Sequence, residues 1–236
     1  MDRNKLQPVF FSLVFFSIAF IYWFVPGLDK SILIAHNPVF HSKFLLGSLK
    51  FLTDAGIPFL LIVCSVIVYF HTGEKDEQGE NIKFFLIVLF TLFIAGIMGD
   101  VLKLITGRER PAIELAGLIE STAYHRTLSL PSGHTAKIMG LVIPFISLSM
   151  NNVRFLNLYK GLFLFTGIGV AYSRIALQAH FPSDVMGGIA VAFLFFPVSV
   201  LLAKKYYKKH EIGRVRNFVI ILICLAFILA FIEMSI

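Results

Sequence analysis

Residues 84–104 read FFLIVLFTLFIAGIMGDVLKL. This run of 21 residues is almost wholly apolar, and its two charged residues, Asp100 and Lys103, lie near its end. An α-helix needs roughly 20 apolar residues to cross the hydrocarbon core of a bilayer. The run therefore predicts a membrane-spanning helix with a polar end.

Six further apolar runs extend this pattern along the chain: 8–25, 56–71, 133–150, 161–179, 184–203 and 217–233. No run alternates as a strand does, and a helix satisfies its own backbone hydrogen bonds in lipid. We therefore expect an all-α, polytopic integral membrane helical bundle. The run 56–71 is the weakest of the seven candidate spans.

The composition agrees with a membrane protein. Of the 236 residues, 57% are hydrophobic and 15% are charged, whereas about a quarter are charged in a soluble domain. The net charge of +7 does not predict nucleic-acid binding, because no soluble face exists to carry a basic footprint. Cys64 and Cys224 fall inside apolar runs, so we expect no disulfide framework. The run 8–25 lacks a small-residue cleavage site, so we interpret it as a retained span.

The distribution of lysine and arginine predicts the orientation. With the N-terminus inside, the cytoplasmic segments 1–7, 72–83, 151–160 and 204–216 hold twelve of these residues, and the opposite side holds seven. Cytoplasmic loops carry the excess of positive charge. We therefore expect the other end of the bundle to face the exterior or periplasm.

Residues 38–52 carry apolar side chains at helical spacing, with lysines and serines between them. This pattern is typical of an interfacial helix along the outer leaflet. Such a helix could help lipids to enter, or it could be a connector that shields the edge of the bundle.

The first of three polar segments follows the run 84–104. Lys103 lies near the end of the run, and Arg110 and Pro111 come after a turn at Gly107. Charges at the edge of the hydrocarbon are costly unless they pair or face a polar cavity, although lysines and arginines at helix ends also extend toward the headgroups. By this reasoning, Arg108 is a surface cation near the headgroups.

The second polar segment, Pro131-Ser132-Gly133-His134, opens the run 133–150. Ser132 is expected to be an ordinary helix N-cap. A helix N-terminus also suits an anion, and Gly133 allows a phosphate to approach the backbone closely. His134 would lie beside the bound group.

The third polar segment holds Ser173 and Arg174, followed by His180 and Asp184. A guanidinium at Arg174 suits bidentate binding of phosphate oxygens. His180 and Asp184 are four residues apart, so on a helical turn their side chains meet. A carboxylate on one imidazole nitrogen fixes the tautomer and leaves the other nitrogen free to attack.

The remaining histidines are weaker candidates. His125 lies in the loop 112–130 and could touch a headgroup, but a solvent-exposed role is favoured. Lys137 could pair with Asp100, extend a phosphate site or shift the pKa of His134. We expect no functional role for four other histidines: His36, His41, His71 and His210.

In order and spacing, the three segments resemble the signature of the type 2 phosphatidic acid phosphatase family, whose fold is shared with vanadium haloperoxidases. The resemblance covers residues 103–184 and is complete at every signature position. It implies a six-span core, with 217–233 as an extra C-terminal helix. We accordingly expect a single membrane-embedded phosphatase domain over residues 1–236, with its motif core at 100–203.

The resemblance also implies roles for individual residues. His180 would attack phosphorus and form a phosphohistidine, and Asp184 would orient it. His134 would protonate the leaving oxygen and later activate water. The residues that would hold the phosphoryl oxygens are Lys103, Arg110, Ser132, the amide of Gly133, and Arg174.

The function expected on these grounds is hydrolysis of a phosphomonoester or pyrophosphate on a membrane lipid at the outer face of a cytoplasmic membrane. Phosphatidylglycerophosphate, undecaprenyl diphosphate, phosphatidic acid and lipid A are the lipid classes implied. We expect no metal or cofactor, because cations could replace metal ions and no acidic metal-ligand cluster is present in the sequence. Short loops and the absence of glycosylation acceptors favour a bacterial inner membrane.

Two other functions remain open from the sequence. A lipid-to-lipid phosphotransferase would use the same histidine with a different acceptor. A non-catalytic lipid-phosphate transporter or binding protein would keep the charged pocket, but binding alone does not need His134 and His180 together with Asp184.

Overall fold

The computed structural model describes residues 3–25, 27–35, 43–71, 75–116, 128–148 and 156–235. Within these ranges the chain forms helices and no strand, so the predicted all-helical fold is confirmed. The helices are α1 (Arg3–Phe24), α2 (Leu28–Ala35), α3 (Lys43–His71), α4 (Lys75–Thr106), α5 (Pro111–Glu114), α6 (Gly133–Ser147), α7 (Leu156–Ala176), α8 (Pro182–Lys209) and α9 (Ile212–Ser235).

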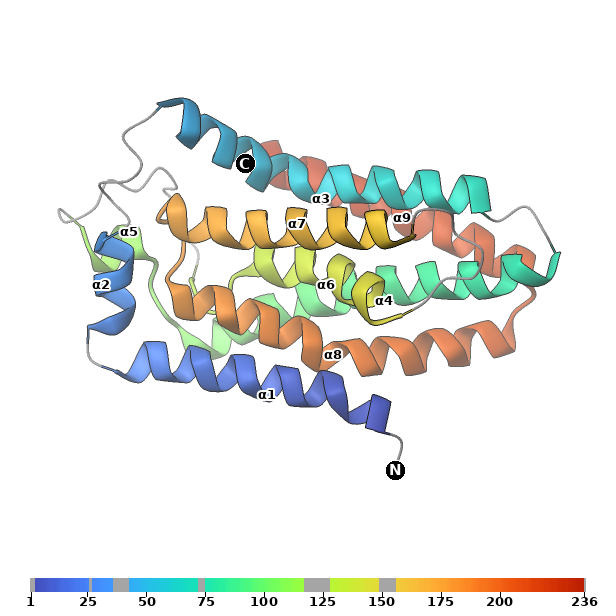
Figure 1. Cartoon of the computed structure of the whole chain (residues 1–236), viewed down its shortest axis with the longest axis horizontal. Coiled ribbons are helices and arrows are strands. Elements are labelled where there is room, and N and C mark those ends of the chain that lie inside the picture. The colour runs from blue at the N-terminus through green and yellow to red at the C-terminus, as the bar shows by residue number, and fades with distance from the viewer. Residues whose placement is uncertain are drawn as a thin grey trace.

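The longer helices run side by side along the long axis of the molecule, and the short α2 and α5 lie at one end (Figure 1). The central helix is α6, which packs against α4, α7 and α8. Most of its residues are buried. The first helix, α1, packs along α8 on the outside of the bundle.

Five helices in the described residues are long and apolar enough to cross a membrane, namely α1, α3, α4, α8 and α9. The predicted spans 133–150 and 161–179 correspond to α6 and α7, which do not meet this criterion. With 15 residues, α6 measures about 22 Å, shorter than the hydrocarbon core of roughly 30 Å. Since other helices surround α6, its polar N-terminus is enclosed by protein rather than by lipid.

The third helix corrects two predictions. Residues 38–52 were expected to form a separate interfacial helix and 56–71 a short span, but α3 is continuous from Lys43 to His71. Residues 38–42 lie outside the described part. Between these two predicted segments α3 packs against α7: Thr53 hydrogen-bonds Ser173, and a Cβ on Gly56 would lie 2.6 Å from Val170 Cγ2.

The last helix, α9, extends the predicted run 217–233 at both ends and packs against α3 and α4. It buries only a narrow stripe of small or branched residues, and it exposes isoleucine, leucine and phenylalanine on its other sides. A helix that is apolar all round suits a lipid environment. The buried stripe consists of Val215, Val219, Ala226 and Ala230.

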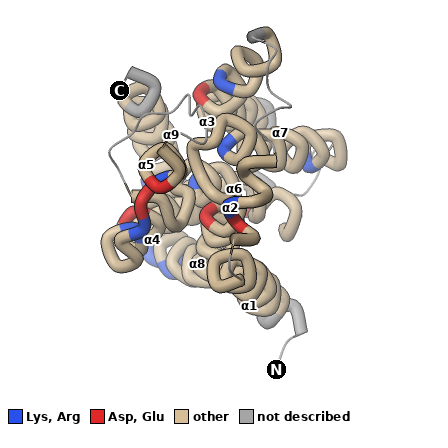
Figure 2. Tube along the Cα trace, turned by 90° about the vertical axis from the view of Figure 1, so that its left-hand side faces the viewer, with Lys and Arg blue, Asp and Glu red and all other residues tan. Residues whose placement is uncertain are grey.

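The two ends of the bundle differ in charge. The end of α8 and the start of α9 carry a cluster of basic residues at one end. The opposite end, which faces the viewer in Figure 2, holds α2 and α5 and has acidic residues beside basic ones. All three polar segments of the sequence lie at this second end.

Candidate active site

The polar segments converge because four helices begin or end at the same level. Lys103 lies in the last turn of α4 and Arg174 in the last turn of α7. Ser132 is the N-cap of α6, and Asp184 lies in the first turn of α8. The backbone N–H of Ser132 donates to the carbonyl of Asp184 at 2.8 Å, which joins the starts of α6 and α8.

The first segment changes direction at Gly107. Its φ of 62° is left-handed, and its N–H donates to the Lys103 carbonyl at 3.0 Å, which ends α4. Residues 107–110 then run without helical structure into α5. In an extended segment alternate side chains share a side, so Arg108 and Arg110 both point inward while Glu109 is exposed.

The second segment brings a helix N-terminus against a lysine. Ser132 occupies the N-cap position as predicted, but its hydroxyl makes no side-chain cap hydrogen bond. Instead it accepts a hydrogen bond from the Thr135 hydroxyl at 3.0 Å. A Cβ on Gly133 would lie 2.9 Å from Lys103 Nζ, so the lysine ammonium lies close against the start of α6.

His134 lies in the first turn of α6 and is half-buried. It is therefore the more accessible of the two predicted catalytic histidines. The groups that interact with it electrostatically are Arg174, Lys137, His180 and Lys103.

The third segment is a tight reversal between α7 and α8. Gln178 adopts a left-handed φ of 56°, and the Arg174 carbonyl accepts hydrogen bonds from the N–H groups of Ala179 and His180, at 3.0 and 3.1 Å. The new helix is then capped by Asp184, whose Oδ2 accepts from the Phe181 N–H at 2.8 Å. His180 is thus fixed by backbone bonds on one side and by the helix start on the other.

His180 and Asp184 meet, with Nδ1 of the imidazole 3.4 Å from Oδ2 of the carboxylate. The Ser129 hydroxyl lies between them, 3.3 Å from Nδ1 and 2.5 Å from Oδ2. All three side chains are buried. Burial lowers the pKa of His180 well below its ordinary value, and the nearby positive charges, Arg110 first, lower it further. The imidazole is therefore held neutral.

The cations surround this imidazole. Arg110 and Arg174 are both buried, and Arg110 donates to the carbonyl of Ala179 at 3.4 Å. Lys103 is mostly buried and pairs with Asp100, with Nζ 2.8 Å from Oδ1. All the residues predicted to bind or transform a phosphate, in the three segments, therefore lie in one region.

Arg108 corrects a prediction. It was expected to be a surface cation, but its side chain is only 7% exposed. Its guanidinium contacts Asp184 Oδ1 at 2.9 Å, Asp29 Oδ2 at 2.7 Å and the Ser183 hydroxyl. The guanidinium also stacks over the Phe181 ring, at 4.0 Å from the ring centroid. Charges buried in this way are paired, since an unpaired one would be very costly.

Asp29 attaches α2 to the site. It accepts hydrogen bonds from the N–H of Ser183, at 3.0 Å, and from the Ser183 hydroxyl. Burial raises the pKa of Asp29, while the bonds from Ser183 and Arg108 oppose that rise. An apolar cluster of Leu33, Leu115 and Phe181 packs α2 and α5 together over the same end.

Three residues of this network, Asp29, Ser129 and Ser183, were not singled out in the sequence, and Arg108 was placed at the surface. The sequence does contain a signal for Arg108. Pro111 disfavours helix in the residues before it, and in an extended segment Arg108 and Arg110, two positions apart, point to the same side. Asp29 is 79 positions from Arg108, and no local pattern links them.

Other predicted positions fall elsewhere. His125 and most of the loop 112–130 lie outside the described residues, as do His36 and His41. His210 lies at the opposite end of α8, stacked on Tyr206 with ring centroids 4.2 Å apart. It is therefore far along the bundle from the polar segments.

The arrangement suits an anion rather than a cation. No group of three or more histidine, cysteine or acidic residues in the described part of the chain could hold a metal ion. Asp29 and Asp184 are both engaged by Arg108. What converges is a neutral imidazole, a second histidine and three cations, which is the chemistry that a phosphoryl group requires.

Comparisons with known proteins identify the same family as the sequence motifs. The model of the PAP2 superfamily matches residues 84–208, which is more than half of the chain. The protein thus belongs to the class of integral membrane helical bundles. It is a member of the PAP2 superfamily, which confirms the resemblance noted in the sequence.

Two curated relatives are similar in sequence. A "Lipid A 1-phosphatase" of Rhizobium etli is 28% identical over 155 residues, which cover 60% of this chain and 64% of that protein. A "Lipid A 1-phosphatase" of Rhizobium johnstonii is 26% identical over 178 residues, which cover 68% of this chain and 66% of that protein. The chain thus spans just under two thirds of the length of these relatives.

One solved structure shares the fold. It is described as the first transmembrane PAP2 type phosphatidylglycerolphosphate phosphatase from Bacillus subtilis. The match has a TM-score of 0.63 at 22% identity and covers 87% of this chain and 98% of that one. The predicted polytopic membrane bundle is therefore confirmed.

Proposed function

We propose that the protein is a lipid phosphate phosphatase that acts through a phosphohistidine at His180. The observation that carries the proposal is the buried contact of His180 with Asp184 and Ser129, surrounded by Arg110, Arg174 and Lys103. A structural histidine does not need three cations around it. A nucleophile that attacks an anionic phosphoryl group does.

The contacts of His180 support Nε2 as the attacking nitrogen. Nδ1 of His180 faces Asp184 and Ser129, so its proton is held there and Nε2 carries the free lone pair. In the first step Nε2 bonds to phosphorus while the phosphorus–oxygen bond to the lipid breaks, and His134 gives its proton to the departing oxygen. In the second step His134 takes a proton from water, the oxygen of which displaces His180 and releases phosphate.

The cations supply the electrostatic part of this reaction. Lys103, Arg110 and Arg174 would neutralise the equatorial oxygens of the transferring group, and the Ser132 hydroxyl and Gly133 amide would donate hydrogen bonds to them. In many other phosphoryl-transfer enzymes, metal ions supply this positive charge. We therefore propose that turnover needs no added metal.

The substrate is proposed to be a membrane lipid of the lipid A or phosphatidylglycerophosphate type. Two observations support this class: the polar segments lie at one end of a membrane bundle, and the relatives are named for such lipids. Undecaprenyl diphosphate and phosphatidic acid offer the same phosphate chemistry, and they complete the set of substrates to be compared.

The excess of lysine and arginine at the far end of α8 and the start of α9 supports an orientation with that end in the cytoplasm. The active end would then face the periplasm or exterior of a bacterial inner membrane. We propose further that residues 1–236 form one domain with its catalytic core at 100–203.

The test is a phosphate-release assay with the purified protein in detergent, with a chelator and no added metal, over the four lipid classes. We expect release from at least one of them and none in His180→Ala, which should still bind the lipid. Release that needs a divalent metal would contradict the metal-independent reaction. Labelled phosphate that appears in a second lipid, with little free phosphate, would favour the phosphotransferase.

A further inference from the structure

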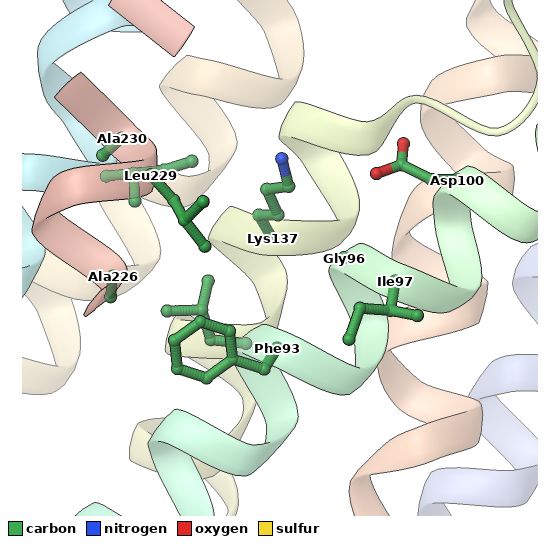
Figure 3. Close-up of a pocket in the computed structure, with 10 residues that line it drawn as sticks. Phe93, Gly96, Ile97, Asp100, Lys137, Ala226, Leu229 and Ala230 are labelled. Atoms are coloured by element: carbon green, nitrogen blue, oxygen red, sulfur yellow. The ribbon is translucent and has the colours of Figure 1, made fainter. Parts of the chain in front are cut away.

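A cavity lies beside the proposed phosphate site, between α4, α6 and α9 (Figure 3). Its walls include Phe93 and Ile97 of α4, Lys137 of α6, and Ala226 and Leu229 of α9. Its volume is about 220 Å³. Pockets for drug-sized ligands measure roughly 300–1,000 Å³, so this cavity fits a segment of a chain rather than a whole lipid.

The cavity is apolar except at one end. Figure 3 shows the Lys137 ammonium at about the level of Asp100, with Phe93 and Ala226 further down. Phe93 precedes Asp100 by seven positions in α4, which is about 10 Å of helix. The cavity therefore passes from polar to apolar as it leaves the end of the bundle that holds the site.

Packing of the Lys137 methylene groups places its ammonium at the polar end of the cavity. A Cβ on Gly96 would lie 3.1 Å from both Cγ and Cε of Lys137, so the methylene groups lie flat against α4. A lysine in a membrane-embedded helix is costly unless it faces a polar group or cavity. Lys137 is such a lysine, and it lies at the polar end of the otherwise apolar cavity.

The polar end connects directly with the proposed phosphate-binding residues. Asp100 lines the cavity and pairs with Lys103 at 2.8 Å. Lys103 Nζ in turn lies against Gly133, at the start of α6. One ion pair therefore separates the mouth of the cavity from the residues proposed to hold the phosphate.

We propose that this cavity holds part of a hydrocarbon chain of the lipid substrate, with Lys137 contacting the oxygens that join the chain to the phosphate. The proposal rests on the proposed function, because an amphipathic phosphate is the ligand whose charge and apolar parts match the two neighbouring sites. The wall supplied by α9 lies beyond residues 84–208, the part that matches the family model. Selection of the hydrocarbon chain is thus assigned to α9, which lies outside the part that matches the family model.

The test uses two substitutions of equal size on α9. Leu229 lines the cavity and is 45% exposed, so Leu229→Trp can fill the cavity without disturbing the buried stripe. Ile228 is 56% exposed and does not line the cavity, so Ile228→Trp is the matched control. Kinetics are measured on dioleoyl and dihexanoyl forms of the same phosphatidylglycerophosphate.

We expect Leu229→Trp to raise KM for the dioleoyl lipid about tenfold, the loss that follows when about two methylene groups are driven from an apolar site. KM for the dihexanoyl lipid and kcat for both should change less than about twofold. Ile228→Trp should leave all of these values unchanged. Equal effects of the two substitutions, or equal effects on the two lipids, would overturn the proposal.

Lys137→Met is the second variant. It should raise KM for both lipids to the same degree, and Lys137→Arg should restore most of the loss. An unchanged KM in Lys137→Met would remove this residue from the proposed site.

A binding measurement separates this proposal from the proposed function. Affinity for dioleoyl phosphatidylglycerophosphate is measured for the wild type and both α9 variants in the presence of a chelator. Weaker binding in Leu229→Trp alone supports the chain site even if no lipid is hydrolysed, in which case only the phosphatase proposal fails. Equal binding in all three proteins contradicts the chain site even if the wild type releases phosphate.

Discussion

The Arg108 guanidinium joins two buried carboxylates from distant parts of the chain, Asp29 in α2 and Asp184 in α8. Asp184 in turn contacts His180. A guanidinium is a planar fork with five donors, whereas a lysine ammonium is a point charge on a flexible stem. Arg108 is therefore interpreted as a positioning residue that holds Asp184 at the proposed nucleophile.

Arg108→Lys tests this role. The charge is kept but the two-sided contact is lost, so we expect kcat to fall by up to about a hundredfold through misplacement of His180. KM should change less than about threefold, because Arg108 is not among the residues proposed to hold phosphate. The exposed neighbour provides the control, Glu109→Gln, which should behave as the wild type. A change confined to KM, or an equal loss in the control, would contradict the interpretation.

The protonation of His180 predicts the acid side of the pH profile. Burial and then the positive charges of Arg110 and Arg174 lower its pKa well below 6.5. Lowering the pH therefore protonates the nucleophile only below that value, and activity should persist into mild acid. The measurement is kcat/KM against pH for a soluble, short-chain substrate. An acid limb that His180 controls and that is centred above pH 6.5 would contradict this prediction.

At the scale of the elements, close packing of α4 and α6 sets the position of the second segment. A Cβ on Gly140 would lie 2.8 Å from Leu92 Cα and 2.9 Å from the carbonyl oxygen of Thr91, which are backbone atoms that cannot move independently. The backbones of α4 and α6 therefore approach each other closely at this glycine, as the backbones of membrane helices do at small residues.

Gly140→Ala should force these helices apart. We expect it to destabilise the protein by about 1–3 kcal/mol, the usual effect of overpacking. Gly161 in α7 has no atom within 4 Å of its Cβ direction, so Gly161→Ala should be neutral or stabilising by up to about 1 kcal/mol. Thermal unfolding in detergent measures both. Equal melting temperatures of the two variants would show that this contact does not limit helix packing.

The elements also show what the sequence can and cannot predict. Apolar runs locate the helices, because each run must be long enough for the bilayer. The continuity of α3 was missed, because the lysines and serines of 38–52 suggested an interfacial helix. The contacts of Thr53 and Gly56 with α7 could not be seen in the sequence. The contact of His180 with Asp184 was anticipated from a spacing of four, although His180 precedes α8 and is placed by the turn after α7.

Across the whole molecule, the site depends on contacts between distant segments. The approach of Arg108 to Asp29 joins positions 79 residues apart, and both are ordinary charged residues in the sequence. Local patterns cannot predict such a pair. The motifs identify the residues of the family signature, but not the neighbours that hold them.

The charge difference between the two ends predicts the orientation in the membrane. In a Cys224→Ser background, Ile113→Cys at the α5 end should react with an impermeant thiol reagent added to intact cells. Lys208→Cys, near the end of α8, should react only after permeabilisation. Both side chains are exposed in the structure, so burial does not bias the comparison. The reverse labelling would place the site in the cytoplasm.

Trapping the phosphoenzyme tests the proposed role of His180 most directly. His134→Ala should slow the second step, so a radiolabelled lipid phosphate with a good leaving group should label this variant covalently, in an acid-labile, alkali-stable bond. We expect the label to map to His180 and to be absent when His180→Ala is added. Label at another residue, or full turnover by His180→Ala, would contradict that role.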